Sequence, residues 1–287
     1  MHIMKMKKSA LNLASCIAIS SLPLAALADL QLLDEASMSN VTGQAGVTIE
    51  LETEIDIGAI IYTDEGSLSV NEVFIGGTNR VDLFQEGMDA ANGGNPFIIN
   101  ATTKLDELKI DFDISADGEA QIKIFPTNFA APVDFRITTG AWELQDSDGN
   151  VTLTLLDNFA LDGIFTQMWA TIGQDDVLGE ERLNLKVRMG IDDLDFDVPF
   201  LGLGIRDMRM TRSDYDDNPN LLSANAYIEA NIYNGERAAG GDALAIDLVS
   251  MDADITVGAI QLGGTSIGSM KLDNLSIENS TMRIYGH

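Results

Sequence analysis

Strict alternation of apolar and polar side chains constrains the fold of this chain most. From Val47 to Ile57 apolar residues occupy every second position with one exception, and Glu50, Glu52, Glu54 and Asp56 lie between them. Side chains of a strand point alternately to its two faces, so this pattern predicts a strand with one buried face. The same alternation recurs at 110–114, 151–155, 182–189 and 226–232. The sequence therefore predicts an all-β protein, with one helical turn at Phe84–Ala91.

A six-residue unit, apolar-x-x-apolar-x-apolar, interrupts this alternation. Its apolar residues cannot share one face of a regular strand, because a regular strand places only alternate residues on a face. A β-bulge or a corner shifts the phase by one residue and restores a common face. The sequence therefore predicts a bend at each unit. The units are Val70–Ile75, Leu105–Ile110, Leu156–Leu161, Ile191–Phe196, Ile205–Met210 and Leu272–Ile277.

The N-terminal and C-terminal parts of the chain resemble each other. Ile55–Ile60 returns as Ile255–Ile260, and Gly66–Ile75 returns as Gly268–Ile277. This similarity predicts an internal duplication. The six-residue units are irregularly spaced, which excludes a leucine-rich-repeat solenoid, whose repeats recur every ~20–29 residues. The predicted fold is an elongated bent sheet, a β-sandwich or an irregular β-solenoid.

The N-terminus has the features of an export signal. Three lysines among residues 5–8 precede an apolar run at 11–27, and Ala26-Leu27-Ala28 fits a small-x-small cleavage site. The alternative is a lipoprotein signal, in which Cys16 is lipidated.

Three segments follow from this N-terminus. They are a signal peptide at 1–28, a capping segment at 29–46 and a single all-β domain at 47–287. No later stretch has the ~20 apolar residues of a transmembrane helix, so no transmembrane segment is predicted after signal removal. The only cysteine is Cys16. An exported chain without disulfides is typical of a bacterial protein.

The charge of the chain argues against nucleic acid as a partner. There are 17 Lys and Arg residues against 45 Asp and Glu residues, and the formal net charge is −28. Phosphate binding needs clustered basic side chains, which an acidic chain of this kind lacks.

Residues 33–77 resemble the start of a known family. The similar stretch begins with Leu33-Asp34-Glu35, continues through Met38–Ile49, and includes Ile57-Gly58 and Ile61–Asp64. The pattern is similar to an uncharacterised family of exported gammaproteobacterial proteins, some of which are labelled FilA-like or pilus-associated. The resemblance implies a cell-surface or filament context, and it implies no catalytic residues.

Clustered oxygen-bearing side chains make residues 146–150 a candidate calcium site. Asp146, Asp148 and Asn150 offer carboxylate and amide oxygens, which Ca²⁺ prefers. The spacing departs from that of an EF-hand, and the segment lies between two predicted strands. A hairpin tip without a metal is therefore the alternative, and no other cofactor is predicted.

No catalytic constellation is present in the sequence. Gly264–Gly268 has the lettering of a nucleophile elbow around Ser266. That motif needs a histidine base within reach, and the only histidine outside the predicted signal is His287. The acidic stripe of the first strand is predicted to be solvated and to block edge-to-edge pairing of sheets. The sequence predicts that the protein is not an enzyme.

These features predict an exported protein of the outer cell surface or the extracellular space, with the periplasm as an alternative. Its predicted function is structural or interactive, associated with a pilus, an adhesin or a biofilm. The predicted partners are other surface proteins or copies of itself. The alternative function is that of a soluble periplasmic or secreted module that binds an apolar ligand in a bent sheet.

Overall fold

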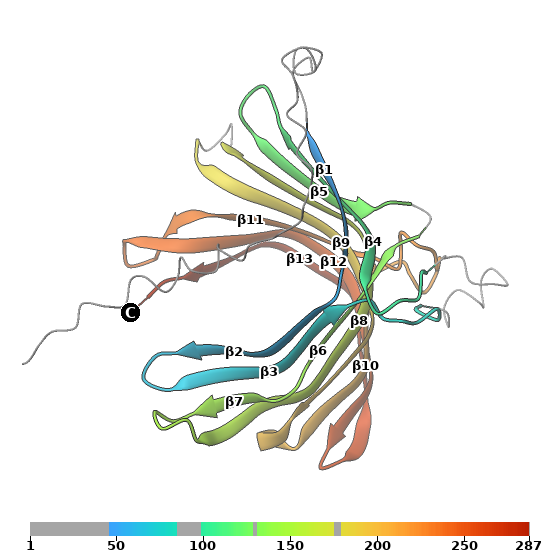
Figure 1. Cartoon of the computed structure of the whole chain (residues 1–287), viewed down its shortest axis with the longest axis vertical. Coiled ribbons are helices and arrows are strands. Elements are labelled where there is room, and N and C mark those ends of the chain that lie inside the picture. The colour runs from blue at the N-terminus through green and yellow to red at the C-terminus, as the bar shows by residue number, and fades with distance from the viewer. Residues whose placement is uncertain (1–45, 85–98, 129–130, 175–178, 287) are drawn as a thin grey trace, which may run out of the picture. The chain divides into compact units, whose positions relative to one another are not determined.

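One antiparallel sheet of 13 strands makes up the described part of the chain (Figure 1). A computed structural model describes residues 46–84, 99–128, 131–174 and 179–286. The chain divides into Met1–Gly43 and Gln44–His287, and the described residues belong to the second unit. The strands are β1 (Val47–Thr53), β2 (Ile55–Thr63), β3 (Ser67–Gly76), β4 (Leu105–Ile114), β5 (Ala120–Pro126), β6 (Val133–Thr139), β7 (Trp142–Gln145), β8 (Val151–Gln174), β9 (Glu181–Val198), β10 (Leu203–Thr211), β11 (Ala226–Glu236), β12 (Asp242–Leu262) and β13 (Thr265–Ile284).

The all-β prediction is confirmed. The described residues contain one short 3-10 helix, η2 (Pro199–Leu201), and no α-helix. The predicted signal peptide, nearly all of the capping segment and all but the first residue of the helical turn at Phe84–Ala91 lie outside the described residues.

The sheet bends into two arms that meet at a crease (Figure 1). The upper arm contains β1, β4, β5 and β11, the lower arm contains β2, β3, β6, β7 and β10, and the long strands β8, β9, β12 and β13 belong to both. Pairing partners change at the crease. β9 pairs with β11 along 182–189 and with β10 along 191–198, and β12 changes partner between residues 252 and 254. Of the three predicted forms, the structure is the bent sheet.

Backbone irregularities lie where the six-residue units predict them. The third residue of a unit has a left-handed φ in five of the six units, at Glu72 (51°), Glu107 (55°), Asn158 (52°), Asp207 (53°) and Asn274 (54°). Non-glycine residues seldom adopt this region, so each of these residues marks a break in the regular strand. The register with a neighbouring strand shifts beside Glu107, Asn158 and Asn274, as at a β-bulge, and stays constant around Glu72 and Asp207. The structure therefore confirms an irregular backbone at five of the six units. The unit Ile191–Phe196 differs, because its third residue, Asp193, has no positive φ.

Carboxylates of neighbouring strands accept hydrogen bonds from two of these irregular positions. The backbone N–H of Asp207 donates to Asp195 Oδ1 at 2.8 Å, and the N–H of Asn274 donates to Asp254 Oδ1 at 2.7 Å. A break in the regular strand leaves backbone groups without their usual strand partner, and a buried group without a partner is costly. Part of the acidic surplus therefore stabilises the bends.

Two glycines allow backbones to approach each other closely at the crease. A Cβ atom at Gly163 would lie 2.4 Å from the carbonyl oxygen of Gly190, and a Cβ atom at Gly190 would lie 2.1 Å from the carbonyl oxygen of Ala224. Both distances are far below van der Waals contact, so the crease needs residues without a side chain at these positions.

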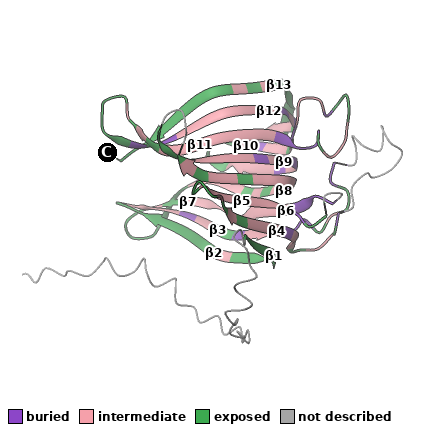
Figure 2. Cartoon of the chain, turned by 90° about the horizontal axis from the view of Figure 1, so that it is seen from above, coloured by how far each residue is buried: buried purple, intermediate pink, exposed green. Residues whose placement is uncertain are grey.

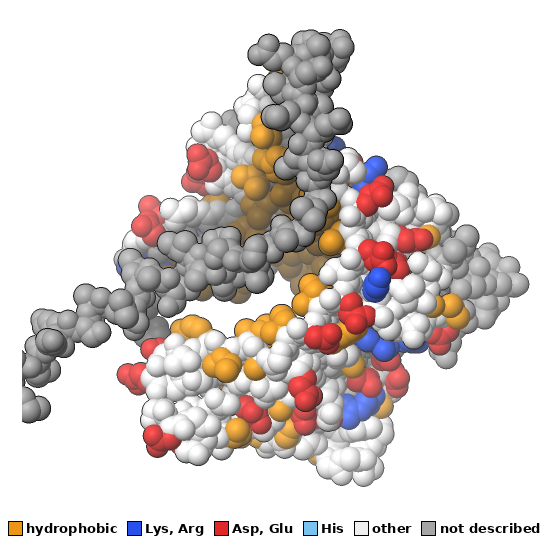
Figure 3. Space-filling view, in the orientation of Figure 1, with side chains coloured by type: hydrophobic (Ala, Val, Ile, Leu, Met, Phe, Trp, Pro, Cys, Tyr) orange, Lys and Arg blue, Asp and Glu red, His pale blue; other side chains and the backbone are white. Residues whose placement is uncertain are grey.

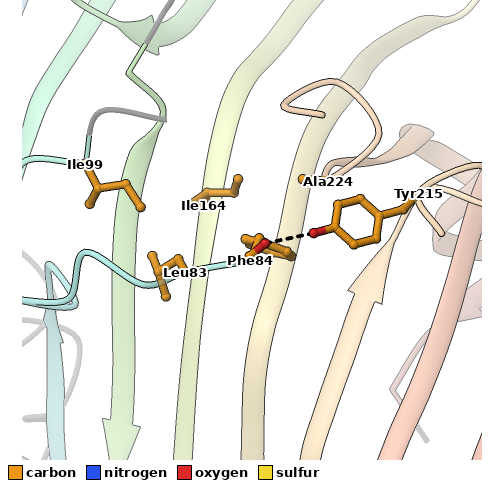
Figure 4. Close-up of a cluster of buried hydrophobic side chains, with 6 residues drawn as sticks. All are labelled: Leu83, Phe84, Ile99, Ile164, Tyr215 and Ala224. Atoms are coloured by element: carbon orange, nitrogen blue, oxygen red, sulfur yellow. Dashed lines mark hydrogen bonds between the residues drawn. The ribbon is translucent and has the colours of Figure 1, made fainter. Parts of the chain in front are cut away.

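A small core covers the outer side of the crease. Its buried residues come from β8 and from segments between strands, and they are Leu83, Phe84, Ile99, Ile164, Tyr215 and Ala224. Figure 4 shows the Tyr215 hydroxyl donating a hydrogen bond to the Phe84 carbonyl oxygen at 3.0 Å. The two rings meet edge to face, with centroids 6.1 Å apart. These contacts fix the segment after β3 and the β10–β11 connection against the bend.

The two stretches of similar sequence form hairpins with different registers. Ile55 pairs with Ile75, whereas Ile255 pairs with Leu272 and not with the equivalent Ile277. The hairpins share the left-handed third residue of the unit but not its pairing. The internal duplication stays a prediction.

Candidate functional site

One face of the upper arm is apolar from β1 to β13. Antiparallel partners point to the same face of a sheet, so the register defines rows of side chains. One row is Ile49, Ile110, Ile124, Met168, Val187, Ile228, Met251 and Ile277. The next row is Val47, Phe112, Ile122, Ala170, Leu185, Ala230, Leu248 and Ser280. Only Ser280 among these side chains is polar.

The lower arm has an apolar face of the same kind. One row is Ile55, Ile75, Ile137, Leu161 and Leu194. A second is Tyr62, Leu68, Leu144 and Leu153, and a third is Phe196, Ile205 and Ile260. Aliphatic side chains make up most of these rows.

The apolar faces of both arms meet on the inner side of the crease. Met189, Ala226 and Met251 of the upper arm belong to the same packed cluster as Leu194, Met208 and Ile255 of the lower arm. This cluster closes the bottom of the bend, so the two apolar faces form the walls of one groove. We call the rows named above, with this cluster, the apolar groove.

The walls of the apolar groove are exposed away from the crease. A third row of the upper arm also belongs to the groove, and it consists of Ile114, Ala120, Ile172, Leu183, Ile232, Ile246 and Met282. In these rows Ile49 is 49% exposed, Ile172 48%, Tyr62 69% and Met282 53%. Figure 3 shows hydrophobic side chains gathered on the inner surfaces of the arms, beside a hollow between them. Monomeric proteins rarely expose a contiguous apolar surface of more than a few hundred Å², and such a surface marks a binding site.

The opposite face of the sheet is polar. A row of the upper arm is Asp111, Lys123, Trp169, Lys186 and Glu229. Lys186 Nζ lies 3.6 Å from Glu229 Oε1, and the guanidinium of Arg188 lies 5.0 Å from the ring centroid of Tyr227. Such pairs suit a solvated surface. The sheet therefore separates a polar outer face from an apolar inner one.

An ion cluster holds the outer side of the crease. Asp162 Oδ2 accepts hydrogen bonds from Arg80 Nη1 at 2.9 Å and Arg136 Nη2 at 2.6 Å, and Asp162 Oδ1 accepts one from Arg136 Nε at 2.6 Å. Asp162 is 5% exposed. Arg80 Nη2 also lies 3.3 Å from Asp192 Oδ2. Because these residues come from the segment after β3 and from β6, β8 and β9, the cluster ties that segment to three strands.

Three carboxylates gather beside this ion cluster. Oxygen atoms of Asp193, Asp195 and Asp207 lie within 4.8 Å of one another. Among the described residues, these three carboxylates form a cluster that could hold a metal ion. Burial, followed by repulsion from Asp195 and Asp207, raises the pKa of Asp193 to about 6. Asp193 and Asp207 also line a polar pocket of about 600 Å³ that includes Arg80 and Arg209. The charge and oxygen type of the three carboxylates suit a divalent cation.

Protonation of Asp193 in mild acid is expected to stabilise the folded protein, and Asp193→Asn is expected to remove this effect. The folded-state pKa of Asp193, about 6, exceeds the ordinary value of 3.8. The native state therefore takes up a proton at this carboxyl first, so the contribution of Asp193 to the free energy of unfolding rises as the pH falls through 6 toward 4. Asparagine does not ionise, so the variant should be more stable than wild type at pH 7 and should gain less on acidification. Urea unfolding from pH 7 to pH 4 with EDTA measures both effects.

The control for this experiment is Asp217→Asn, which removes the same charge at an exposed position. It should retain the wild-type dependence of stability on pH. Equal slopes for the two variants would show that net charge, and not the crease carboxylates, determines the response.

Asp146, Asp148 and Asn150 lie together at the tip of the β7–β8 hairpin, where the sequence places them. Asp146 Oδ1 accepts hydrogen bonds from the backbone N–H of Asp148 at 3.0 Å and of Asn150 at 2.9 Å. Asn150 Nδ2 donates to both Asp146 oxygens, at 3.3 and 3.1 Å. These bonds, that from the Asn150 backbone first, lower the pKa of Asp146. The Asp146 carboxylate stabilises the turn, and calcium binding at these residues stays a prediction.

Ser266 lies on β13, directly after a two-residue turn. The turn residues Gly263 and Gly264 have φ values of 58° and 77°, which favour glycine. A nucleophile elbow needs a strand-to-helix turn, and here the lettering falls in a β-hairpin.

Sequence reasoning missed the crease cluster around Asp162, because its members lie far apart along the chain.

The comparisons with known proteins concern the N-terminal part of the chain. The model of a family of unknown function, DUF6160, matches residues 4–116. The matched region contains β1–β4. The likeness of residues 33–77 to FilA-like proteins stays a prediction. No curated protein and no solved structure matches the chain. In the described ranges, no helix is long and apolar enough to cross a membrane. The chain is thus similar to DUF6160 over its N-terminal region, and that family has no assigned activity.

Proposed function

We propose that this protein is an exported binding module for the acyl chains of amphiphilic lipids, which lie in the apolar groove. The observation that supports this function is the continuous apolar inner face, which extends over every strand of the bent sheet. The proposed location is the periplasm or the extracellular space, in agreement with the export signal predicted from the sequence.

The chemistry of the groove favours a hydrocarbon over a protein partner. Hot spots of protein interfaces are enriched in Trp, Tyr and Arg, and a polar rim with hydrogen bonds surrounds them. The rows of the groove contain mainly Ile, Leu, Val and Met, and they contain no charged side chain. Strand pairing satisfies the backbone groups of the inner strands. The burial of apolar side chains is therefore the main contribution that the groove makes to binding an occupant.

The dimensions of the groove suit long acyl chains. Neighbouring strands lie ~4.8 Å apart, so the eight strands of the upper arm span roughly 34 Å. One leaflet of a bilayer has a hydrocarbon depth of about 15 Å, half of the ~30 Å core. The groove is therefore long enough for acyl chains that lie across the strands.

A second function, a structural role at the cell surface or in a filament, is favoured by a different observation. In the part of the chain that the structure describes, both borders of the sheet are strands with one unpaired side. The resemblance of residues 33–77 to FilA-like, pilus-associated proteins agrees with this role. It is compatible with ligand binding, because it uses the borders of the sheet and not its inner face.

Ile172→Asp is expected to weaken acyl-chain binding about tenfold or more. Ile172 lies on β8 in the row that includes Ile114, Ala120 and Leu183. An acyl chain seated there would bury the new carboxylate away from water, which costs more than the ~1.4 kcal/mol that corresponds to a factor of ten. Ile172 is 48% exposed in the free protein, so the fold should tolerate the change. Fluorescence titration with cis-parinaric acid measures the affinity.

Thr171→Asp is the matched control. It places the same charge one residue earlier on the same strand, where the side chain points to the polar outer face. It should bind the probe as wild type does. Equal weakening by the two variants, or the absence of saturable binding to wild type, would contradict the proposed function. Organic extraction of protein purified from its native envelope, followed by mass spectrometry, would identify the natural ligand.

A further inference from the structure

The sheet ends in two open borders. Among the described residues β1 pairs only with β4 and β2 only with β3, so residues 47–63 form one border, here called the N-terminal edge. Within the same ranges β13 pairs only with β12, so residues 265–284 form the other border, here called the C-terminal edge. Figure 2 shows exposed residues on β13 at one side of the stack of strands and on β1 and β2 at the other. Unpaired edge strands are templates for pairing with another chain.

We propose that the C-terminal edge of one copy pairs with the N-terminal edge of a second copy, so that copies join head to tail in one continuous antiparallel sheet. The occupant of each edge is thus the opposite edge of the same protein. This inference goes beyond the proposed function, and it does not depend on ligand binding.

Strand direction supports the head-to-tail contact. The upper arm consists of β1, β4, β5, β8, β9, β11, β12 and β13, and every neighbouring pair is antiparallel. Because eight is an even number, β13 runs opposite to β1. In the lower arm β13 runs opposite to β2 by the same count, through β3, β6, β8, β9, β10 and β12. A translated copy therefore presents an antiparallel strand along the whole border.

The crease supplies a register for this contact. The N-terminal edge bends between Thr53 and Ile55, where β1 ends and β2 begins. The C-terminal edge bends between Leu272 and Leu275, where the register of β12 and β13 shifts. Two bent edges can pair along their full length only when the bends coincide. This requirement places Ile55 of one copy beside Leu272 of the next, because both residues begin the lower-arm part of their edge.

Charge disfavours contact between two N-terminal edges. Glu50, Glu52, Glu54 and Asp56 line that border, and among the ion pairs of the described residues only Glu52 has a partner, Lys104 at 2.6 Å. Like charges on opposing strands are destabilising. The C-terminal edge has two basic residues, Lys271 and Arg283, and two acidic ones, Asp273 and Glu278. Its charge is balanced, so it does not repel the acidic border.

The apolar groove would continue through such a junction. Ile49 on one border and Met282 on the other belong to the same inner face of the sheet, and each is about half exposed. Pairing of the borders covers part of this apolar surface, which favours association. A head-to-tail contact that does not close into a ring propagates, so the expected product is a linear filament.

A cysteine pair tests the contact, with Cys16 replaced by serine so that no other thiol is present. The chain with both Ile55→Cys and Leu272→Cys is treated with a short bis-maleimide at physiological salt. A ladder of dimers, trimers and larger products on a denaturing gel is expected. Each single variant should run as a monomer on the denaturing gel, because its thiol lies beside a residue of the next copy that has no thiol to be cross-linked.

Other outcomes would overturn the proposal. A dimer from Leu272→Cys alone would show that two C-terminal edges pair with each other. The absence of a ladder from the double variant would show that the edges do not meet. Sedimentation velocity of the unsubstituted chain tests self-association without any effect of the substitutions on the fold. Mass that grows beyond the dimer with concentration is expected, and a limit at the monomer or dimer contradicts the proposal.

Discussion

Gly190→Ala is expected to lower the free energy of unfolding by about 3 kcal/mol, at the upper end of the usual cost of overpacking. The added methyl group would lie 2.1 Å from the carbonyl oxygen of Ala224 and 2.9 Å from Phe84 Cζ. The Phe84 ring can shift, but the carbonyl oxygen belongs to the backbone that covers the crease. The β10–β11 connection must therefore move away from β9. Urea unfolding followed by circular dichroism measures the loss.

Gly58→Ala is the matched control for this prediction. Gly58 also lies within a strand, β2, but no atom lies within 4 Å of the position that its Cβ would occupy. Alanine restricts the unfolded chain more than glycine does, so this variant should be neutral or about 0.5 kcal/mol more stable. Equal effects of the two substitutions would mean that the backbones do not approach each other at the crease.

Asp162→Asn is expected to lower the free energy of unfolding by about 3 kcal/mol, which is near the lower limit for breaking a buried ion pair. Asparagine keeps the size of the side chain but removes the charge that Arg80 and Arg136 share. The lower limit applies because the side chains of Arg80 and Arg136 are 29% and 36% exposed, and water partly solvates them after the change. Thermal and urea unfolding at pH 7 measure the loss.

Asp82→Asn provides the comparison, since Asp82 also pairs with Arg80, at 2.9 Å, through a side chain that is 56% exposed. An exposed pair contributes less than about 1 kcal/mol. A loss from Asp82→Asn that matches the loss from Asp162→Asn would show that burial at the crease does not strengthen the ion cluster.

The bends of this sheet could be predicted from sequence because their cause is local. A side chain's face is determined by counting along its own strand, so apolar residues at uneven spacing require a phase shift. The left-handed residues Glu72, Glu107, Asn158, Asp207 and Asn274 occur at the same position of their units for that reason. The hairpin tip at Asp146–Asn150 follows equally from local turn chemistry.

The crease and its polar cluster could not be predicted in this way. Arg80, Arg136 and Asp162 are separated by tens of residues, and one sequence contains no record of which strands become neighbours. The close approach at Gly163 and Gly190 likewise depends on the pairing of β8 with β9 and on the covering connection. The difference in register between the two similar hairpins has the same origin, because pairing is a property of two strands together.

The sequence by itself determined that the chain forms strands, which side chains share a face and where each strand changes phase. It also determined that one face is apolar and the other charged. Only the tertiary structure decided that the apolar faces of two arms meet across a crease and remain open away from it. The reason is that alternation specifies the faces of each strand, whereas strand order and long-range pairing decide whether a face is covered by another layer. In this protein the bend covers the apolar face only at the crease, and the exposed remainder is the proposed binding surface.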